Sequence, residues 1–169
     1  MLIATIVVIV GLVAVAQLVP TSVLLNTNSR NDATALVFAQ RAMEFLREQP
    51  FNESNIAPLF SDPQGVLCPT ASTCELGDPA QPNVFVGSPV VTGSSPIILD
   101  FSAAPVPNYS FTYSDPNDPT GAVYDVRWAV ATTVNSIGWP TSRRIVLGVF
   151  RRGMKTPSYP ITLDTLVSK

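Results

Sequence analysis

The first 29 residues form an apolar run without a charged side chain, and the first charged residue of the chain is Arg30. Between Met1 and Leu25 the polar residues are few, namely Thr5, Gln17, Thr21 and Ser22. About 20 apolar residues make a helix ~30 Å long, which matches the hydrocarbon core of a bilayer. The run therefore predicts an apolar helix.

Two simpler interpretations explain this run less well. A cleaved signal peptide has a basic n-region and a shorter apolar core, and neither is present, although residues 14–16 (AVA) resemble a cleavage site. A plain single-pass anchor explains the length of the run but leaves the pattern that follows it unexplained.

Residues 30–49 carry a second, amphipathic pattern in which apolar side chains recur at helical spacing between charged ones. The residues expected to pack the helix against a sheet are Leu36, Phe38, Ala39, Ala42, Met43, Phe45 and Leu46. No glycine or proline lies within residues 21–32, and Pro50 ends the pattern. We therefore expect one continuous helix over 1–49, about 75 Å long, with an apolar first half and an amphipathic second half.

Residues 50–107 are rich in proline and serine and predict loops with short strands at 83–87 and 96–101. Beyond them, apolar and polar residues alternate as in half-buried strands. This alternation predicts strands at 108–114, 123–134, 143–152 and 160–167. Short connections favour an antiparallel meander, one face of which covers the stripe of the helix.

The expected fold class is therefore α+β, with a long N-terminal helix packed on a C-terminal antiparallel sheet. Four segments follow from the patterns: an apolar half-helix (1–29), an amphipathic half-helix (30–49), a loop region (50–107) and the sheet (108–169). We expect residues 30–169 to form the globular head.

Composition argues against several classes of function. The chain has 169 residues and a net charge of −2, and it lacks a basic patch of the kind that binds nucleic acid. It contains no histidine, which removes the commonest general base and a frequent metal ligand. Residues 115–119 (DPNDP) resemble the spacing of calcium ligands but lack the glycine and the distal glutamate of an EF-hand, and they are interpreted as a turn. We expect no enzyme activity, no cofactor and no metal site.

The two cysteines of the chain, Cys68 and Cys74, lie close together in a proline-rich segment. In a chain that leaves the cytoplasm, such a pair predicts a local disulfide. Two unpaired small residues or an incomplete metal pair are the alternatives.

The N-terminal patterns resemble those of type IV pilins. Residues 1–17 (MLIATIVVIVGLVAVAQ) are similar to the apolar segment that follows the prepilin cleavage motif, and residues 35–51 (ALVFAQRAMEFLREQPF) are similar to the end of the long pilin helix. The resemblance covers about the first 51 residues, and beyond them only the layout is similar. The sequence departs from the family pattern in that no basic leader is present and no acidic residue occurs before Asp32. Two interpretations follow: either several residues are missing ahead of Met1, or the subunit lacks the usual glutamate, which would put the N-terminal ion pairing between subunits in doubt.

The resemblance implies a pilin-like roll whose N-terminal helix packs among copies of itself in a filament. The residues it assigns to this polymerisation core are Ile3, Ile6, Val7, Val8, Val10, Leu12, Val13, Val15 and Leu18. Gly11 and Pro20 have two interpretations: residues tolerated in a bilayer helix, or a weak point at which the helix bends or unwinds on assembly.

The expected function is that of a structural subunit of an extracellular type IV pilus or pilin-like filament. The alternatives are a minor pilin or type II secretion pseudopilin, and a membrane-anchored periplasmic or surface binding domain. The expected partners are copies of the chain, the bacterial inner membrane before assembly and the pilus assembly machinery, with no nucleic acid. The expected location is the inner membrane before assembly and the extracellular filament afterwards.

Overall fold

The computed structural model describes residues 11–12, 16, 22, 26, 29, 32–49, 55–56, 61–62, 65–66, 74–91, 93–114, 121–153 and 160–168. The chain divides into two compact units, Met1–Thr34 and Ala35–Lys169. Of the first unit, six described residues before residue 32 have helical backbone but define no continuous helix: Gly11, Leu12, Ala16, Ser22, Asn26 and Ser29.

The one continuous helix of the described residues spans 32–47. Its last turn is closed by the backbone N–H of Glu48, which donates to the carbonyl of Glu44 at 3.1 Å. The side-chain amide of Gln49 donates to the carbonyl of Phe45 at 2.9 Å and satisfies a second carbonyl at this end.

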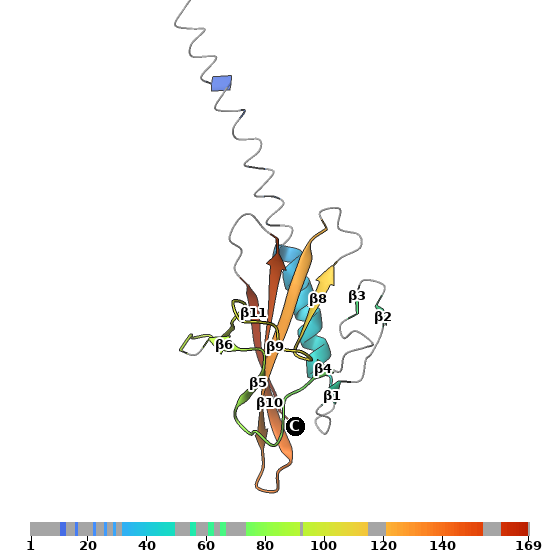
Figure 1. Ribbon diagram of the computed structural model, residues 1–169, viewed down its shortest axis with the longest axis vertical. Coiled ribbons are helices and arrows are strands. Elements are labelled where there is room, and N and C mark those ends of the chain that lie inside the picture. The colour runs from blue at the N-terminus through green and yellow to red at the C-terminus, as the bar shows by residue number, and fades with distance from the viewer. Residues whose placement is uncertain are drawn as a thin grey trace, which may run out of the picture. The chain divides into compact units, whose positions relative to one another are not determined.

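The main sheet is built on two long strands, β9 (Val123–Val134) and β10 (Pro140–Arg152), joined as an antiparallel hairpin (Figure 1). β11 (Ile161–Ser168) pairs with the other edge of β10 from Val149↔Ile161 to Ser142↔Ser168. The bounds of β9 coincide with the stretch in which alternation predicts a strand. Tyr124, Val126 and Trp128 alternate with Asp125 and Arg127 along it, so the two sets face opposite sides of the sheet.

The free edge of β9 is shared by two strands. β8 (Ser110–Ser114) pairs with its first half, from Ser114↔Val123 to Ser110↔Arg127, and β5 (Phe85–Gly87) pairs with its second half, from Gly87↔Ala129 to Phe85↔Ala131. The two strands meet at Trp128, whose N–H donates to the carbonyl of Tyr109 and whose carbonyl accepts from the N–H of Ser88. Both edges of β9 are therefore paired along nearly its whole length.

Three short antiparallel pairs complete the described strands. β1 (Asn55–Ile56) pairs with β4 (Cys74–Glu75), β2 (Ser61–Asp62) pairs with β3 (Gly65–Val66), and β6 (Val90–Val91) pairs with β7 (Ile98–Leu99). The segments predicted as strands at 83–87 and 96–101 therefore contain β5 and β7, with β6 between them.

The predicted fold class is wrong in its central feature. In the described residues the continuous helix is short, sheet predominates, and no long apolar N-terminal helix is defined. The few polar residues of the run 1–29 do not recur at a 3.6-residue period, so its assignment as a helix depended on length and on an assumed bilayer or filament around it. The first helical residue buried against the sheet is Ala35, and the periodic pattern applies only from there.

The predicted transmembrane helix and the predicted location need the same correction. Among the described residues, no helix has both the length and the apolar character needed to cross a membrane. The predicted inner-membrane stage conflicts with this finding, and the extracellular location that depended on it loses its support.

Candidate functional site

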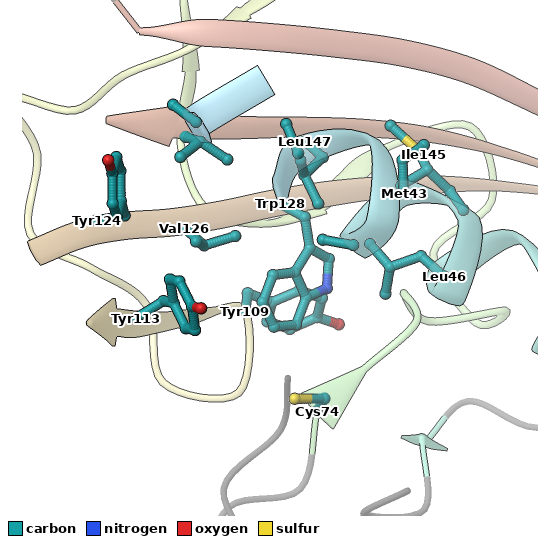
Figure 2. Close-up of a cluster of buried hydrophobic side chains, with 14 of the residues drawn as sticks. Met43, Leu46, Cys74, Tyr109, Tyr113, Tyr124, Val126, Trp128, Ile145 and Leu147 are labelled. Carbon is teal, nitrogen blue, oxygen red and sulfur yellow. The ribbon is translucent and has the colours of Figure 1, made fainter. Parts of the chain in front are cut away.

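Small side chains bring the helix close to one face of the sheet. Ala35, Ala39 and Ala42 are buried, and Ala39 is completely inaccessible. Met43 and Leu46 extend the same stripe, and Figure 2 shows them beside Trp128 and Ile145 of the two long strands. Because alanine has no side chain beyond Cβ, the helix axis can approach the sheet and the larger strand residues fill the space between them.

An aromatic cluster extends this interface. The ring of Phe38 stacks on that of Tyr113, with centroids 4.2 Å apart, and it meets Phe111 edge-on at 6.2 Å. Phe111 in turn lies 5.9 Å from Trp128. The rings connect the helix to β8 and β9, so the helix and the edge strand share one core.

Trp128 is the central residue of this core. Its side chain is 1% exposed, and its indole N–H donates to the backbone carbonyl of Glu75 at 2.9 Å. The side-chain amide of Asn108 donates to the carboxylate of Glu75 at 3.1 Å, and the N–H of Glu75 donates to the carbonyl of Asn108. These bonds hold β4 against the sheet. Burial, together with the charge of Glu75, raises the pKa of Tyr109 to about 12.

The opposite face of the sheet carries an ionic network. Arg127 and Asp125 are each 3% exposed, and the guanidinium of Arg127 contacts both carboxylate oxygens, with Nη2–Oδ2 at 2.9 Å. Arg152 donates to Oδ2 of the same carboxylate at 2.8 Å. Burial favours a higher pKa for Asp125, but the hydrogen bonds from the two guanidinium groups outweigh it and hold the pKa below its usual value.

Arg127 also fixes the segment that covers this face. Its Nη1 donates to the carbonyls of Asp100 and Ala103 at 3.2 and 2.7 Å, and its guanidinium lies 4.9 Å from the ring centre of Phe101. Leu99 and Phe101 belong to a second core that includes Ala129 and Val146 of the long strands. The sheet is therefore covered on both faces.

The hairpin between β9 and β10 ends in an exposed apolar pair, Ile137 and Trp139, which are 77% and 59% exposed. Figure 1 shows this hairpin projecting at the lower end of the sheet. Asn135 organises the turn, because its side-chain oxygen accepts from the N–H groups of Ile137 and Trp139 at 3.1 and 2.9 Å. We call Ile137 and Trp139 the apolar tip.

The residues predicted to pack the helix on the sheet have mixed positions. Four of them are buried or partly buried in the common core besides Ala39 and Ala42, namely Phe38, Met43, Phe45 and Leu46. Leu36 is 40% exposed instead, and Val37 beside it is 64% exposed. Ala35, which the sequence pattern did not single out, is 5% exposed; its position four residues before Ala39 was the available signal.

Most of the predicted polymerisation core lies outside the described residues, as do Pro20 and the DPNDP turn. Leu12 is the exception, with helical backbone and 66% exposure, and Gly11 beside it is helical with open space around its Cα. The residues that lie outside are Ile3, Ile6, Val7, Val8, Val10, Val13, Val15 and Leu18.

The predicted disulfide does not appear as a cysteine pair among the described residues, because Cys68 lies outside them. Cys74 is disulfide-bonded and 2% exposed, where β4 meets the main core. The described residues therefore contain no cysteine pair, and of the predicted Cys68–Cys74 bridge they include only the buried, bonded Cys74.

The chemistry available in the described residues is limited. They contain no group of three or more histidine, cysteine, aspartate or glutamate side chains positioned to hold a metal ion. A groove of about 310 Å3 lies between the helix and β11, lined by Glu44, Arg47, Glu48 and Val167.

Comparison with known proteins returns no relative, since no protein-family model, no curated protein and no solved structure matches the chain.

Proposed function

We propose that this protein is a structural subunit of a pilin-like filament, in which copies of the chain assemble through the apolar N-terminal segment 1–29. The observation that carries the proposal is that apolar side chains of the helix remain uncovered by the head's own sheet. Leu36 and Val37 are 40% and 64% exposed in the helical turns that follow the charge-free run.

Apolar side chains that remain exposed to water favour association between copies of the chain. Each buried Val or Leu side chain contributes about 1.5–3 kcal/mol relative to exposure in water. The first 29 residues supply no charged group that would keep such a surface solvated. In this proposal the partners are other copies of the chain, delivered by a pilus assembly machinery.

The architecture of the head is consistent with a structural role. The sheet is covered on one face by the helix and on the other by the segment around Leu99 and Phe101, so both cores are closed. A head with both of these cores closed can be displayed repeatedly along a polymer.

The test is electron microscopy and sedimentation of the purified full chain, asking for a helical polymer. Val8→Asp is expected to reduce polymer yield sharply, because an unpaired carboxylate in a dry interface costs several kcal/mol. Val37→Asp is expected to raise the concentration needed for assembly while the head stays folded, since Val37 is exposed in the single chain.

Leu166→Asp is the matched control, because Leu166 is 66% exposed on β11, away from the helix residues that carry the proposal. It should leave assembly unchanged. Polymer yield from Val8→Asp equal to that of the unaltered chain, or a chain that stays monomeric under all conditions, contradicts the proposal.

A further inference from the structure

The apolar tip lies at one end of the sheet, and long stretches of the sequence that form this end contain no charged residue. No charged residue occurs in 128–142, which includes the whole turn, or in 79–99, which contains the β5 strand that pairs with the second half of β9. Asn83 joins the two stretches, since its N–H donates to the carbonyl of Thr132 and its side chain accepts from Thr133. On β9 and β10 the nearest charged residues are Arg127 and Arg143.

The turn is rigid in its backbone. The N–H of Asn135 donates to the carbonyl of Trp139 at 2.9 Å, and the N–H of Gly138 donates back to the carbonyl of Asn135 at 3.0 Å. Gly138 has a φ of 80°, a left-handed conformation that glycine adopts without strain. The side chains of Ile137 and Trp139 are therefore presented at little further cost in backbone entropy.

The same bonds decide what kind of surface the tip fits. The N–H groups of residues 135, 137, 138 and 139 all donate within the turn, and residue 140 is a proline, which has none. These four donors stay paired when the turn leaves water, whereas the N–H of Ser136 has no partner among the described residues and needs the polar headgroup region of a bilayer. Unpaired backbone donors are the main barrier to placing a loop in an apolar medium.

The charge of a surface decides whether it can bind the uncharged apolar tip. The groove lined by Glu44, Arg47 and Glu48 is charged and does not complement an uncharged apolar tip. A surface that has no net charge and an apolar interior does complement such a tip. Tryptophan prefers the water–hydrocarbon boundary of such a surface, where its ring is buried and its N–H stays near polar groups.

We propose that the apolar tip inserts Ile137 and Trp139 into the interface of an uncharged lipid bilayer. This contact is separate from the apolar segment 1–29 and does not depend on filament formation. β11 ends at Ser168, opposite Ser142, so the described part of this strand stops short of the tip.

The test uses the two tryptophans of the chain as internal reporters. The full chain is mixed with phosphatidylcholine vesicles whose acyl chains carry bromine, which quenches tryptophan within the bilayer. Trp139→Phe leaves Trp128, which is 1% exposed in the core, as the reference. Emission that is quenched and shifted to shorter wavelength in the unaltered chain, but not in Trp139→Phe, is the expected result.

A second variant measures the contribution of the neighbouring side chain. Ile137→Ser is expected to lower the inserted population of Trp139 about tenfold, the effect of removing one large apolar side chain from lipid. Leu166→Ser alters another exposed apolar residue, 66% exposed compared with 77% for Ile137, and should leave the quenching unchanged. Circular dichroism confirms that both variants fold.

The proposal is overturned if the chain sediments with the vesicles while the unaltered protein and Trp139→Phe are quenched equally, because the attachment then lies elsewhere. It is also overturned if the chain does not bind vesicles, or if Trp139 emission responds to a soluble neutral polysaccharide or to protein concentration instead of to lipid.

Discussion

Gly148 of β10 lies directly beneath the ring of Phe101, so close that a Cβ at residue 148 would be 2.9 Å from Cε2 of that ring. The same Cβ would lie 3.0 Å from Cδ1 of Leu99. The absence of a side chain at one position in the middle of a long strand is thus what lets the segment 99–103 close over the second face of the sheet.

We expect Gly148→Ala to lower the free energy of unfolding by about 1–3 kcal/mol, because the ring of Phe101 is held by Arg127 and Phe150 and cannot move away freely. Urea denaturation measures the change. Phe101→Leu in the same chain should recover part of the loss, and a double-mutant cycle without coupling between the two positions would contradict the predicted clash.

Asp125→Asn tests the ionic network. Removing the carboxylate charge leaves Arg127 buried without its counter-ion, and we expect a loss of about 3–5 kcal/mol at neutral pH. The control is Asp164→Asn, which breaks the exposed pair between Arg144 and Asp164 and should cost no more than about 1 kcal/mol. Equal effects of the two substitutions would show that burial adds nothing to the network.

The same network gives a pH dependence of known sign. The pKa of Asp125 is lowered in the folded protein, so its stabilising contribution is present above the ordinary value of 3.8 and is lost as the pH falls through the lowered pKa. The difference in stability between the unaltered chain and Asp125→Asn should therefore shrink below about pH 4. A difference that stays constant from pH 7 to pH 2 is the contrary result.

Tyr109 predicts a change at the alkaline end. Its pKa is raised from 10.0 to about 12 by burial and by the charge of Glu75, so the unfolded chain releases this proton first. Stability should be unaffected below pH 10 and should fall as the pH rises from about 10 to about 12. Tyr109→Phe should make this alkaline loss smaller, as measured by denaturation at several pH values, and an unchanged alkaline profile would argue against the raised pKa.

Trp128→Phe separates the hydrogen bond of the indole from its bulk. The substitution leaves the carbonyl of Glu75 without its donor and opens a small cavity, and we expect a loss of about 1–3 kcal/mol. Trp139→Phe, at an exposed position, should change stability by less than about 0.5 kcal/mol. Thermal unfolding of the two variants compares them, and a larger effect at residue 139 would reverse the assigned roles.

Periodic patterns in the sequence were sufficient to predict those helices and strands whose two sides carry different kinds of side chain. The alternation along 123–134 corresponds to β9, and the helical spacing of Ala39, Met43 and Leu46 corresponds to the buried stripe of the helix. These patterns are legible because each residue's exposure repeats with the geometry of its own helix or strand. The run 1–29 has no such repeat, which is why its interpretation as the first half of a long helix did not hold.

Only the tertiary structure decided which segments pair along a strand edge, which pack on a face of the sheet and which contact a buried charged side chain. The joint pairing of β5 and β8 with β9, the closure of Phe101 over Gly148 and the seating of Arg127 on the carbonyls of Asp100 and Ala103 join residues far apart in the chain. The exposure of Leu36 has the same origin, because the width of sheet available to the helix sets which apolar side chains are covered. Residue type and spacing determine which surfaces need burial, whereas the long-range packing of the chain determines what buries them.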